Sequence, residues 1–258
     1  MTTSSRPTTP QVPAVARAAR MLEELSAAPA GLTLSELARA IGAPKSSCLA
    51  VCATLVEAGL LARTPSGAYR LGWKVVPLGR SYLAQSNLVT EFRRVDQELN
   101  LLPEDTIVLS LLDGRTVVYV GTRPGLRPVA MHYEIGLRLP AHCTASGKAL
   151  LAALAGADLA ARYADEVFDT LTPHSLTRMP DLTAELARTR QRGYAIDDEE
   201  TALGMICVGA AIVSPGGRPA GALSVSMVKA TVDDGRITDA AESIRHLTRA
   251  LAARLGTL

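Results

Sequence analysis

The residue types best suited to contacting phosphate groups gather in two short stretches near the N-terminus. Lys45, Ser46 and Ser47 follow a proline, and ammonium and hydroxyl groups are common donors to phosphate oxygens. Arg63 and Arg70 flank a Pro-Ser-Gly turn. A hairpin there would lay both guanidinium groups along a sugar-phosphate backbone, although two solvated arginines on an edge hairpin are the alternative. The pattern favours contact with duplex DNA.

A second stretch, Ala145-Ser-Gly-Lys148, carries the hydroxyl and amine that a catalytic serine or a phosphate loop would use. It matches neither the G-x-S-x-G turn of serine hydrolases nor the G-x-x-x-x-G-K-[ST] phosphate loop. The stretch does suit the start of a helix, where the free backbone N–H groups of Ala145 and Ser146 would hold a carboxylate. A plain helix cap without a ligand explains it equally well.

Acidic and sulfur-bearing residues elsewhere offer little for catalysis or metal binding. The run from Asp197 to Glu200 is typical of a solvated acidic loop, since carboxylates are rarely buried unpaired. His142 and Cys143 are adjacent, and adjacent residues of a strand point to opposite faces, which argues against a thiol nucleophile. The 4 cysteines fit neither a disulfide framework nor a paired zinc motif. We expect no catalytic residue, no metal and no cofactor.

The phosphate-contacting stretches need a scaffold, and the pattern around them predicts a winged helix-turn-helix over residues 13–73. Apolar spacing indicates a first helix from Ala14. Thr33-Leu-Ser-Glu36 is a capping box that would begin a second helix. A third begins near Pro44 after only two or three residues, which is the tight joint of a helix-turn-helix. Residues 60–71 then form two short strands, the wing.

The third helix has two distinct faces. Cys48 and Cys52 belong to an apolar stripe, which indicates core packing rather than a metal or redox role. The opposite face carries Leu49 and Ala50 and would enter the major groove. The predicted DNA contacts of this helix are therefore its first turn and these two small or apolar side chains.

Charge is unevenly distributed along the 258 residues. Residues 1–80 hold nine Lys/Arg against four Asp/Glu, and the remainder holds eighteen against twenty-one. A basic segment joined to a mildly acidic one is typical of a DNA-binding domain attached to a domain that does not bind DNA. Residues 1–12 are rich in Ser, Thr and Pro and are expected to be a disordered tail. Without an apolar leader or an 18-residue apolar run, we expect a cytoplasmic protein that does not contact membrane.

The rest of the chain predicts a second, α+β domain. Helical spacing over residues 74–100 indicates one or two linker helices. Residues 101–258 then carry two hairpin patterns, 106–120 and 205–228, with helical segments between them. Hairpins with segregated helices predict an antiparallel sheet covered by helices.

Taken together, the motifs resemble the IclR-type bacterial transcriptional regulators over about residues 14 to 255. The matching stretches are Val15-Ala-Arg-Ala18, Leu32-Thr-Leu-Ser-Glu-Leu-Ala38, Pro44-Lys-Ser-Ser47, Thr54-Leu-Val-Glu-Ala-Gly59, Tyr69-Arg-Leu-Gly72, Leu139-Pro-Ala-His-Cys-Thr-Ala-Ser-Gly-Lys-Ala-Leu-Leu151, Arg192-Gly-Tyr-Ala-Ile-Asp-Asp-Glu-Glu200, Gly204 to Ala211 and Ala222-Leu-Ser-Val-Ser226. The resemblance implies a GAF-like effector-binding fold for the C-terminal domain and adds Arg17 to the DNA contacts. It implies an effector pocket formed by Ala145, Ser146, Asp197, Met205, Cys207, Ser224 and Ser226.

One position departs from the family pattern. Members commonly carry an arginine where this chain has Ala50, and alanine cannot reach a guanine or a phosphate. Base reading is therefore expected from Leu49 or Ala50 against thymine methyl groups and from the wing, or else affinity for DNA is reduced.

The resemblance implies a regulator that is not an enzyme. A small organic acid, oxo or aromatic, would bind the C-terminal domain and alter the binding of a double-stranded operator by a homodimer or homotetramer. Two alternatives remain open. One is a metabolic enzyme with a fused helical domain, suggested by Ser146, Lys148 and Cys143. The other is a winged-helix module that binds protein and has no affinity for DNA, suggested by Ala50.

Overall fold

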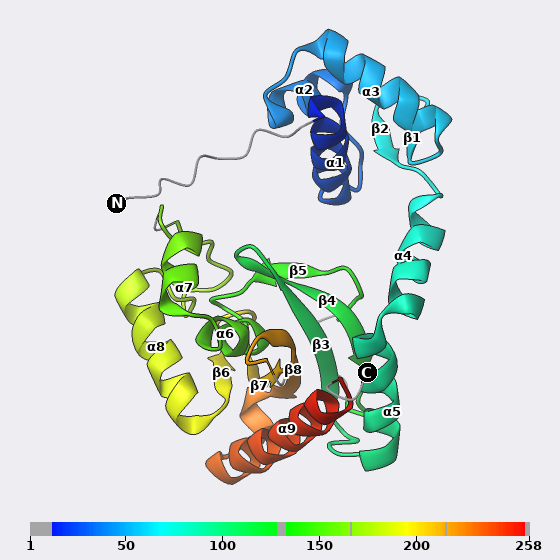
Figure 1. Cartoon of the computed structure of the whole chain (residues 1–258). Coiled ribbons are helices and arrows are strands. Elements are labelled where there is room, and N and C mark those ends of the chain that lie inside the picture. The colour runs from blue at the N-terminus through cyan, green and yellow to red at the C-terminus, as the bar shows by residue number, and fades with distance from the viewer. Residues whose placement is uncertain (1–11, 128–132, 166, 215, 256–258) are drawn as a thin grey trace. The chain divides into compact units, whose positions relative to one another are not determined.

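The computed structural model describes residues 12–127, 133–165, 167–214 and 216–255. The chain divides into two compact units, residues 1–82 and 83–258, which are traced in Figure 1. The expected N-terminal tail lies outside the described residues except for its last position. In the described part of the chain, no helix is both long and apolar enough to cross a membrane.

The N-terminal unit is the predicted winged helix-turn-helix. It contains α1 (Pro13–Ser26), α2 (Leu34–Ile41), α3 (Lys45–Glu57), β1 (Leu61–Arg63) and β2 (Tyr69–Leu71). The capping box forms as expected, because the Thr33 side chain accepts the N–H of Glu36 and the Glu36 carboxylate accepts the N–H of Thr33 at 2.7 Å. Gly42 ends α2 with a φ of 65°, a left-handed conformation that glycine adopts readily. Three residues therefore suffice to turn the chain into α3.

The apolar stripe of α3 packs into the core of this unit. Cys48 and Cys52 are fully buried, and the Cys52 Sγ lies 3.9 Å from the Met21 Sδ on α1. Across the hairpin, β1 and β2 pair antiparallel with Arg63 opposite Tyr69. The two cysteines are core residues, in agreement with the sequence pattern.

Two helices follow the wing, and they differ in their surroundings. None of the residues of α4 (Val75–Gln85), all of which are described, is buried. In contrast, α5 (Asn87–Leu99) buries Val89, Phe92 and Val95 in the core of the C-terminal unit. The boundary between the units falls within α4, after Tyr82. The expectation of a linker through residue 100 is therefore wrong for α5, whose apolar face belongs to the C-terminal core.

The C-terminal unit is built on one antiparallel sheet in the order β5-β4-β3-β8-β7-β6. Its strands are β3 (Thr106–Asp113), β4 (Thr116–Arg123), β5 (Arg138–Pro140), β6 (Ala195–Asp198), β7 (Met205–Val213) and β8 (Pro219–Val228). Both predicted hairpins are present, and β3 joins them by pairing with β8. This pairing places strands from the two ends of the domain at the centre of the sheet.

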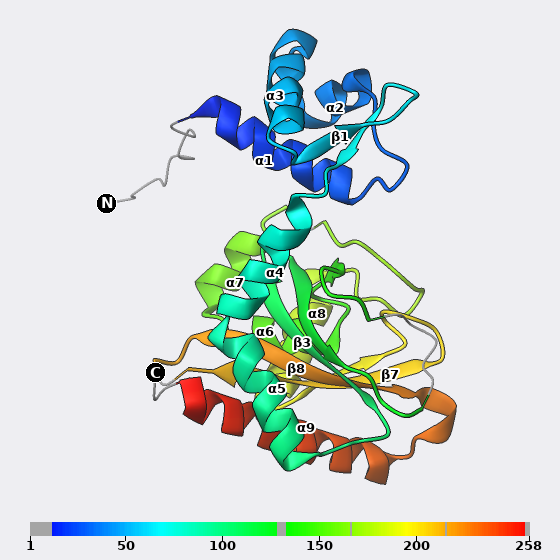
Figure 2. The same cartoon turned by 90° about the vertical axis from the view of Figure 1, so that its right-hand side faces the viewer.

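Helices cover both faces of this sheet (Figure 2). The helices of this unit other than α5 are α6 (Ala145–Ala152), α7 (Gly156–Arg162), α8 (Met179–Arg192), the 3₁₀ turn η1 (Lys229–Thr231) and α9 (Asp234–Leu255). On one face α5 and α9 pack against Leu109 and Val225, among others. On the other, α6, α7 and α8 pack against Val108 and Ala222. Because strand residues alternate between faces, β3, β4 and β8 each contribute to both cores.

The start of α6 lies directly on the sheet, and a glycine of β7 makes this approach possible, while a second glycine lets α6 pack against the turn that precedes it. A Cβ on Gly209 of β7 would lie 2.7 Å from the carbonyl carbon of Ala145 and 2.8 Å from the Ser146 nitrogen. A Cβ on Gly147 would lie 2.2 Å from the carbonyl oxygen of Ala141. A larger residue at Gly209 would push the helix away from the strand, and one at Gly147 would clash with the turn before the helix.

Gly209→Ala should lower the free energy of unfolding by about 1–3 kcal/mol, because overpacking at a backbone contact forces helix and strand apart. Gly156→Ala is the matched control, since a Cβ there has no atom within 4 Å. Urea unfolding of the full chain, followed by circular dichroism, measures both. Equal stabilities for the two variants would contradict this account of the packing.

Candidate functional site

The first candidate site is the exposed face formed by the start of α3 and the wing. Lys45 and Ser46 are exposed and Ser47 is partly exposed in the first turn of α3. Leu49 is half exposed on the same helix, which is unusual for a leucine unless the surface meets a partner. These side chains share the helix surface that faces away from the Cys48–Cys52 core.

The wing presents its two arginines to solvent. Arg63 and Arg70 are exposed on β1 and β2. The Arg63 Nε donates weakly to the Gly67 carbonyl at 3.4 Å, and its guanidinium carbon lies 5.9 Å from the centre of the Tyr69 ring. These contacts stiffen the hairpin but leave guanidinium N–H groups for phosphates.

Two of the nominated DNA contacts, Arg17 and Ala50, are less clearly presented to a DNA duplex than the others. Arg17 is partly buried on α1. Ala50 is exposed, but it also lines an apolar hollow of about 310 Å³ between α1 and α3, together with Val15 and Val51 among others. The small side chain of Ala50 therefore leaves this hollow open, and it offers no hydrogen-bond donor to DNA.

The second candidate site is a cavity on the α6 face of the C-terminal sheet. A row of side chains crosses three neighbouring strands there: Asp197 of β6 lies opposite Cys207 of β7, and Cys207 lies opposite Ser226 of β8. The Cys207 Sγ donates to the Ser226 Oγ at 3.4 Å. Ser224, two residues along β8, points to the same face and also lines the cavity.

The structure brings together six of the seven residues nominated for the effector pocket. The cavity is lined by Tyr119, Tyr133, Thr144, Ala145, Asp197, Thr201, Ala202, Met205, Cys207, Ser224 and Ser226. The exception is Ser146, whose hydroxyl is buried without a hydrogen-bond partner and does not line the cavity. Ser146 is nominated through its backbone N–H at the start of α6, and that contact stays a prediction.

The start of α6 has the free donors that an anion needs. Thr144 caps the helix by accepting the N–H of Gly147 at 3.0 Å. Within the described residues, no protein group accepts the N–H of Ala145 or Ser146. The backbone N–H of Ser146 therefore has no protein acceptor in the described residues, although the Ser146 side chain does not line the cavity.

Sequence reasoning missed five of the lining residues, among them two tyrosines. Tyr119 lies on a strand that the pattern predicted, so its face was readable from strand alternation. Tyr133 lies in an irregular segment, where residue spacing carries no such signal. The two rings are stacked, with centres 6.0 Å apart and planes at 30°. The cavity has a free volume of about 10 Å³, room for about one water molecule.

The acidic run at 197–200 is not the solvated loop that its composition indicates. Asp197 and Glu200 are buried, while Asp198 is exposed. The Asp197 Oδ1 accepts the backbone N–H of Glu200 at 2.8 Å and of Thr201 at 3.2 Å. Glu200 forms an ion pair with Lys148 of α6, which is itself fully buried. That ion pair compensates one of the two buried carboxylates, and composition alone does not reveal it.

Burial changes the titration of both carboxyl groups. It raises the pKa of Glu200 to about 7, opposed by the positive charge of Lys148. Burial also raises the pKa of Asp197, opposed by its hydrogen bonds with Thr201 and by the charge of Lys148. The ammonium group of Lys148 is thus the positive charge that opposes burial at both Asp197 and Glu200. One positive charge beside two buried carboxyl groups favours protonation of one of them.

His142 and Cys143 do not form a catalytic pair, but for a reason other than the one expected. They lie in the turn before α6, not in a strand. Both approach the carbonyl oxygen of Asp169, the His142 Nε2 at 2.9 Å and the Cys143 Sγ at 3.6 Å. Burial raises the pKa of the Cys143 thiol to about 11, which disfavours the reactive thiolate.

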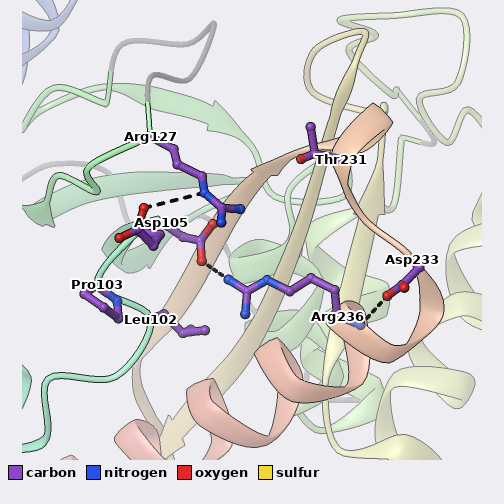
Figure 3. Close-up of a pocket in the computed structure, with 8 residues that line it drawn as sticks. Leu102, Pro103, Asp105, Arg127, Thr231, Asp233 and Arg236 are labelled. Atoms are coloured by element: carbon purple, nitrogen blue, oxygen red, sulfur yellow. Dashed lines mark hydrogen bonds and ion pairs between the residues drawn. The ribbon is translucent and has the colours of Figure 1, made fainter.

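A larger cavity of about 490 Å³ lies at the start of α9 (Figure 3). Arg236 there forms an ion pair with the buried Asp105, and Arg127 lies 3.6 Å from Glu104. Its arginines are therefore already matched by carboxylates. None of the residues nominated for the effector pocket lines it. In the described residues, no group of three or more His, Cys, Asp or Glu side chains could hold a metal ion.

An exposed basic winged helix joined to a sheet domain with a polar cavity defines a two-domain transcription regulator, and comparison with known proteins agrees. Residues 14–65 match the IclR helix-turn-helix domain. Residues 80–253 match the bacterial transcriptional regulator IclR C-terminal domain. The chain belongs to the IclR family of bacterial transcriptional regulators.

Relatives and solved structures share this architecture over nearly the whole chain. The HTH-type transcriptional regulator XynR of Escherichia coli is 32% identical, covering 96% of this chain and 98% of its own. The probable transcriptional regulator SauR of Cupriavidus necator is 34% identical, with coverages of 85% and 88%. The Agobacterium tumefaciens repressor BlcR is 33% identical with a TM-score of 0.61, covering 95% of this chain and 97% of its own.

A regulator from Alicyclobacillus acidocaldarius is 25% identical with a TM-score of 0.80, at coverages of 94% and 98%. The family and these relatives are transcriptional regulators, not enzymes, so the alternative of a metabolic enzyme is not supported.

The raised pKa of Glu200 predicts how stability depends on pH. Its folded-state pKa of about 7 lies above the ordinary value of 4.5, so the folded protein binds more protons than the unfolded chain between these values. The free energy of unfolding should then fall as pH rises from about 4.5 to about 7, by up to about 3 kcal/mol from this group.

Glu200→Gln should flatten that fall, whereas Glu134→Gln, at an exposed carboxyl group, should leave it unchanged. Urea unfolding at a series of pH values measures the slope. A Glu200→Gln slope equal to that of the unmodified protein would show that Glu200 titrates normally in the folded state.

Proposed function

We propose that this protein binds a double-stranded operator through the start of α3 and the wing, and that a small organic acid in the cavity at α6 alters that binding. The observation that carries the proposal is the convergence of Asp197, Cys207, Ser224 and Ser226 beneath the open N–H groups of α6. The effector-binding residues would be Ala145, Asp197, Met205, Cys207, Ser224 and Ser226, together with the backbone N–H of Ser146.

DNA contact is assigned to Lys45, Ser46 and Ser47 on α3 and to Arg63 and Arg70 on the wing. All five are at least partly exposed, and the basic side chains among them suit phosphate oxygens. Leu49 and Ala50 would contact thymine methyl groups, because neither carries a hydrogen-bonding side chain. Arg17 is a secondary contact, since it is partly buried. Sequence reading by this protein would then depend more on the wing and on half-site spacing than on α3.

The acid would be held by the backbone at the start of α6. A helix N-terminus attracts negative charge, and the free N–H groups of Ala145 and Ser146 supply directed donors. Lys148 is not a direct partner, because it is buried in its ion pair with Glu200. An acid held in this way needs a carboxylate small enough to fit between α6 and the sheet.

A second copy of the chain is the proposed occupant of the exposed apolar surface around α4. Trp73 is 75% exposed and Val76 is 69% exposed, and Leu78 and Tyr82 are more than half exposed on the same ten residues. Four large apolar side chains on one short segment would be costly in water if left uncovered. A dimer formed here would carry two DNA-binding units, and such dimers bind two half-sites of DNA whose centres lie one helical turn, about 34 Å, apart.

Removing a wing arginine should weaken binding to DNA from upstream of the gene and reduce its salt dependence. Arg63→Ala and Arg70→Ala should each lower the magnitude of the log–log salt slope by about 1, because each guanidinium releases about one counterion. Arg218→Ala, an exposed arginine at the turn of the other long hairpin, is the matched control. Fluorescence anisotropy at a series of salt concentrations gives the slopes. An unchanged slope for both wing variants would argue for a protein-binding wing.

Charged residues on α4 should break the dimer. Leu78→Glu with Tyr82→Glu, one turn apart, should shift the chain toward the monomer, because carboxylates would be buried at the interface. Leu126→Glu, at another highly exposed leucine, should leave the oligomeric state unchanged. Sedimentation velocity across a concentration series reports the outcome, and a double variant that stays dimeric would place the interface elsewhere.

A further inference from the structure

The α6 cavity is too small for an organic ligand as it stands. Its free volume of about 10 Å³ holds about one water molecule, and pockets that bind small molecules are many times larger. A wall of the cavity must therefore move before a ligand can enter. Most of the described lining is fixed, because it lies on the strands of the sheet or at the start of α6.

Two parts of the described lining lie outside these elements: Tyr133, and Thr201 with Ala202. The second pair belongs to a turn of residues 199–204 between β6 and β7, here called the 199–204 turn. Glu199 in this turn has a φ of 61°, a left-handed conformation that is uncommon for a residue other than glycine. Leu203 is 61% exposed. The turn therefore lies at the surface and is held in a conformation of raised energy.

Side chains fasten the 199–204 turn to neighbouring segments. The Glu199 carboxylate accepts a hydrogen bond from the Lys229 Nζ, beyond β8, at 2.6 Å. The Ser175 hydroxyl donates to the backbone carbonyl of Glu200 at 2.7 Å. Neither contact belongs to the pairing of the strands. The turn can therefore move without breaking the sheet, provided that such side-chain contacts are released.

A third contact of the turn is ionic and buried. Glu200 pairs with Lys148 of α6, and both residues are more than nine-tenths buried. The second carboxylate oxygen of Glu200, Oε2, is buried without a hydrogen-bond partner in the described residues. Asp197 is another buried carboxyl group that experiences the charge of Lys148. One positive charge thus faces two carboxyl groups, so the cluster is electrically neutral only while one of them holds a proton.

Three further ionisable groups surround the cluster. They are Glu185 of α8, Cys143 before α6 and His174 beside Ser175. Glu185 is already paired with two arginines of α8. Burial raises the pKa of the Cys143 thiol to about 11, so the thiol is neutral. His174 is exposed and affects the titration of Glu199. Among the described residues, Lys148 is therefore the cation that pairs with Glu200.

Loss of the proton makes the closed turn less stable. Burial raises the pKa of Glu200 to about 7 from its ordinary value of 4.5, because a buried carboxylate lacks the donors that water supplies. A Glu200 turned out to water regains its ordinary pKa. Between pH 4.5 and 7 the closed turn then binds more protons than the open one. Opening therefore becomes easier as the pH rises through this range, and it levels off above pH 7.

We propose that the 199–204 turn is the gate of the α6 cavity, and that loss of one proton from the cluster of Lys148, Glu200 and Asp197 releases it. The proposal rests on the proposed function only in assigning an effector to this cavity. Entry of that effector is then coupled to pH through Glu200, which does not itself line the cavity. Opening of the turn would expose Cys207, a buried thiol of the lining.

Amide hydrogen exchange of the full chain, followed by mass spectrometry at pH 5, 6, 7 and 8, measures opening of the turn. After division by the intrinsic exchange rate at each pH, exchange of residues 199–204 should rise about 10- to 50-fold from pH 5 to pH 7 and then level off. The reason is that each pH unit between the two pKa values of Glu200 shifts the opening equilibrium by up to about tenfold. Residues 240–251 of α9, which contribute to the core, report global unfolding and should stay better protected.

Labelling of Cys207 tests whether the open turn admits a small molecule to the cavity. Limiting 4,4′-dithiodipyridine is added to the full chain, and peptide mass spectrometry after acid digestion assigns the label. Relative to free cysteine at the same pH, labelling of Cys207 should rise from pH 5 to pH 7 in parallel with exchange of the turn. Cys52 is the internal control, because it is fully buried in the core of the N-terminal unit.

Three variants connect the opening to the buried cluster. Glu200→Gln removes the titrating group and should abolish the rise. Lys148→Met should move the rise to higher pH, because carboxyl groups without the ammonium group hold their protons more tightly. Asp198→Asn is the matched control, since it removes an exposed carboxyl group of the same acidic run that pairs with Lys229. It should keep the rise. Circular dichroism checks folding, and either cluster variant alone provides the test.

The outcomes separate the gate from the proposed function. Exchange of the turn that does not change with pH, or that changes equally in Glu200→Gln, would overturn the release by proton loss. A rise at residues 133–139 instead of 199–204 would place the gate at Tyr133. A rise at the turn without labelling of Cys207 would show that the turn does not close the cavity. A DNA complex that no small acid alters would contradict the proposed function and leave the gate in place.

Discussion

The close approach of α6 to the sheet is the constraint on which the C-terminal unit depends. Helix and strand meet backbone to backbone at Gly209, with no side chain between them. That contact places the free N–H groups at the start of α6 over Asp197, Cys207 and Ser226, which lie side by side on β6, β7 and β8. Elsewhere on this face of the sheet, apolar side chains fill the space beneath the helices. A sheet face that is elsewhere a hydrophobic core thereby contains a polar cavity. The approach of the α6 N–H groups to this polar row is a consequence of the missing Cβ at Gly209.

The buried ion pair of Lys148 and Glu200 also holds α6 in place against the sheet. It joins α6 to the turn after β6, and the backbone N–H of Glu200 in turn holds the carboxyl group of Asp197. Thr201 adds a hydrogen bond from its hydroxyl to the Cys143 carbonyl just before α6. Two walls of the cavity are thus tied together by side chains that do not need to touch a ligand. A buried ion pair contributes little net stability, so its value here lies in fixing geometry.

Local patterns predicted much of this protein, and their failures have physical causes. The capping box at Thr33, the core role of Cys52 and the shared face of Ser224 and Ser226 all follow from spacing within one element. The burial of Glu200 does not, because its ion-pair partner Lys148 lies 52 residues away in the chain. Tyr133 was missed because irregular segments have no periodicity from which a direction can be read. Contacts between distant segments decided the chemistry of the site.

The connector helix α4 has a thermodynamic property that follows from its lack of buried residues. An isolated helix of eleven residues is marginal in water, and Gly79 within α4 lowers its helical propensity further. Pro77 is tolerated because it lies in the first turn. Whatever covers the apolar side chains of α4 must therefore also supply the free energy that keeps it helical. If a second copy of the chain covers α4, as proposed above, coil-to-helix ordering of α4 and subunit association form one coupled equilibrium, and the stiffness of the link between the two units then depends on protein concentration.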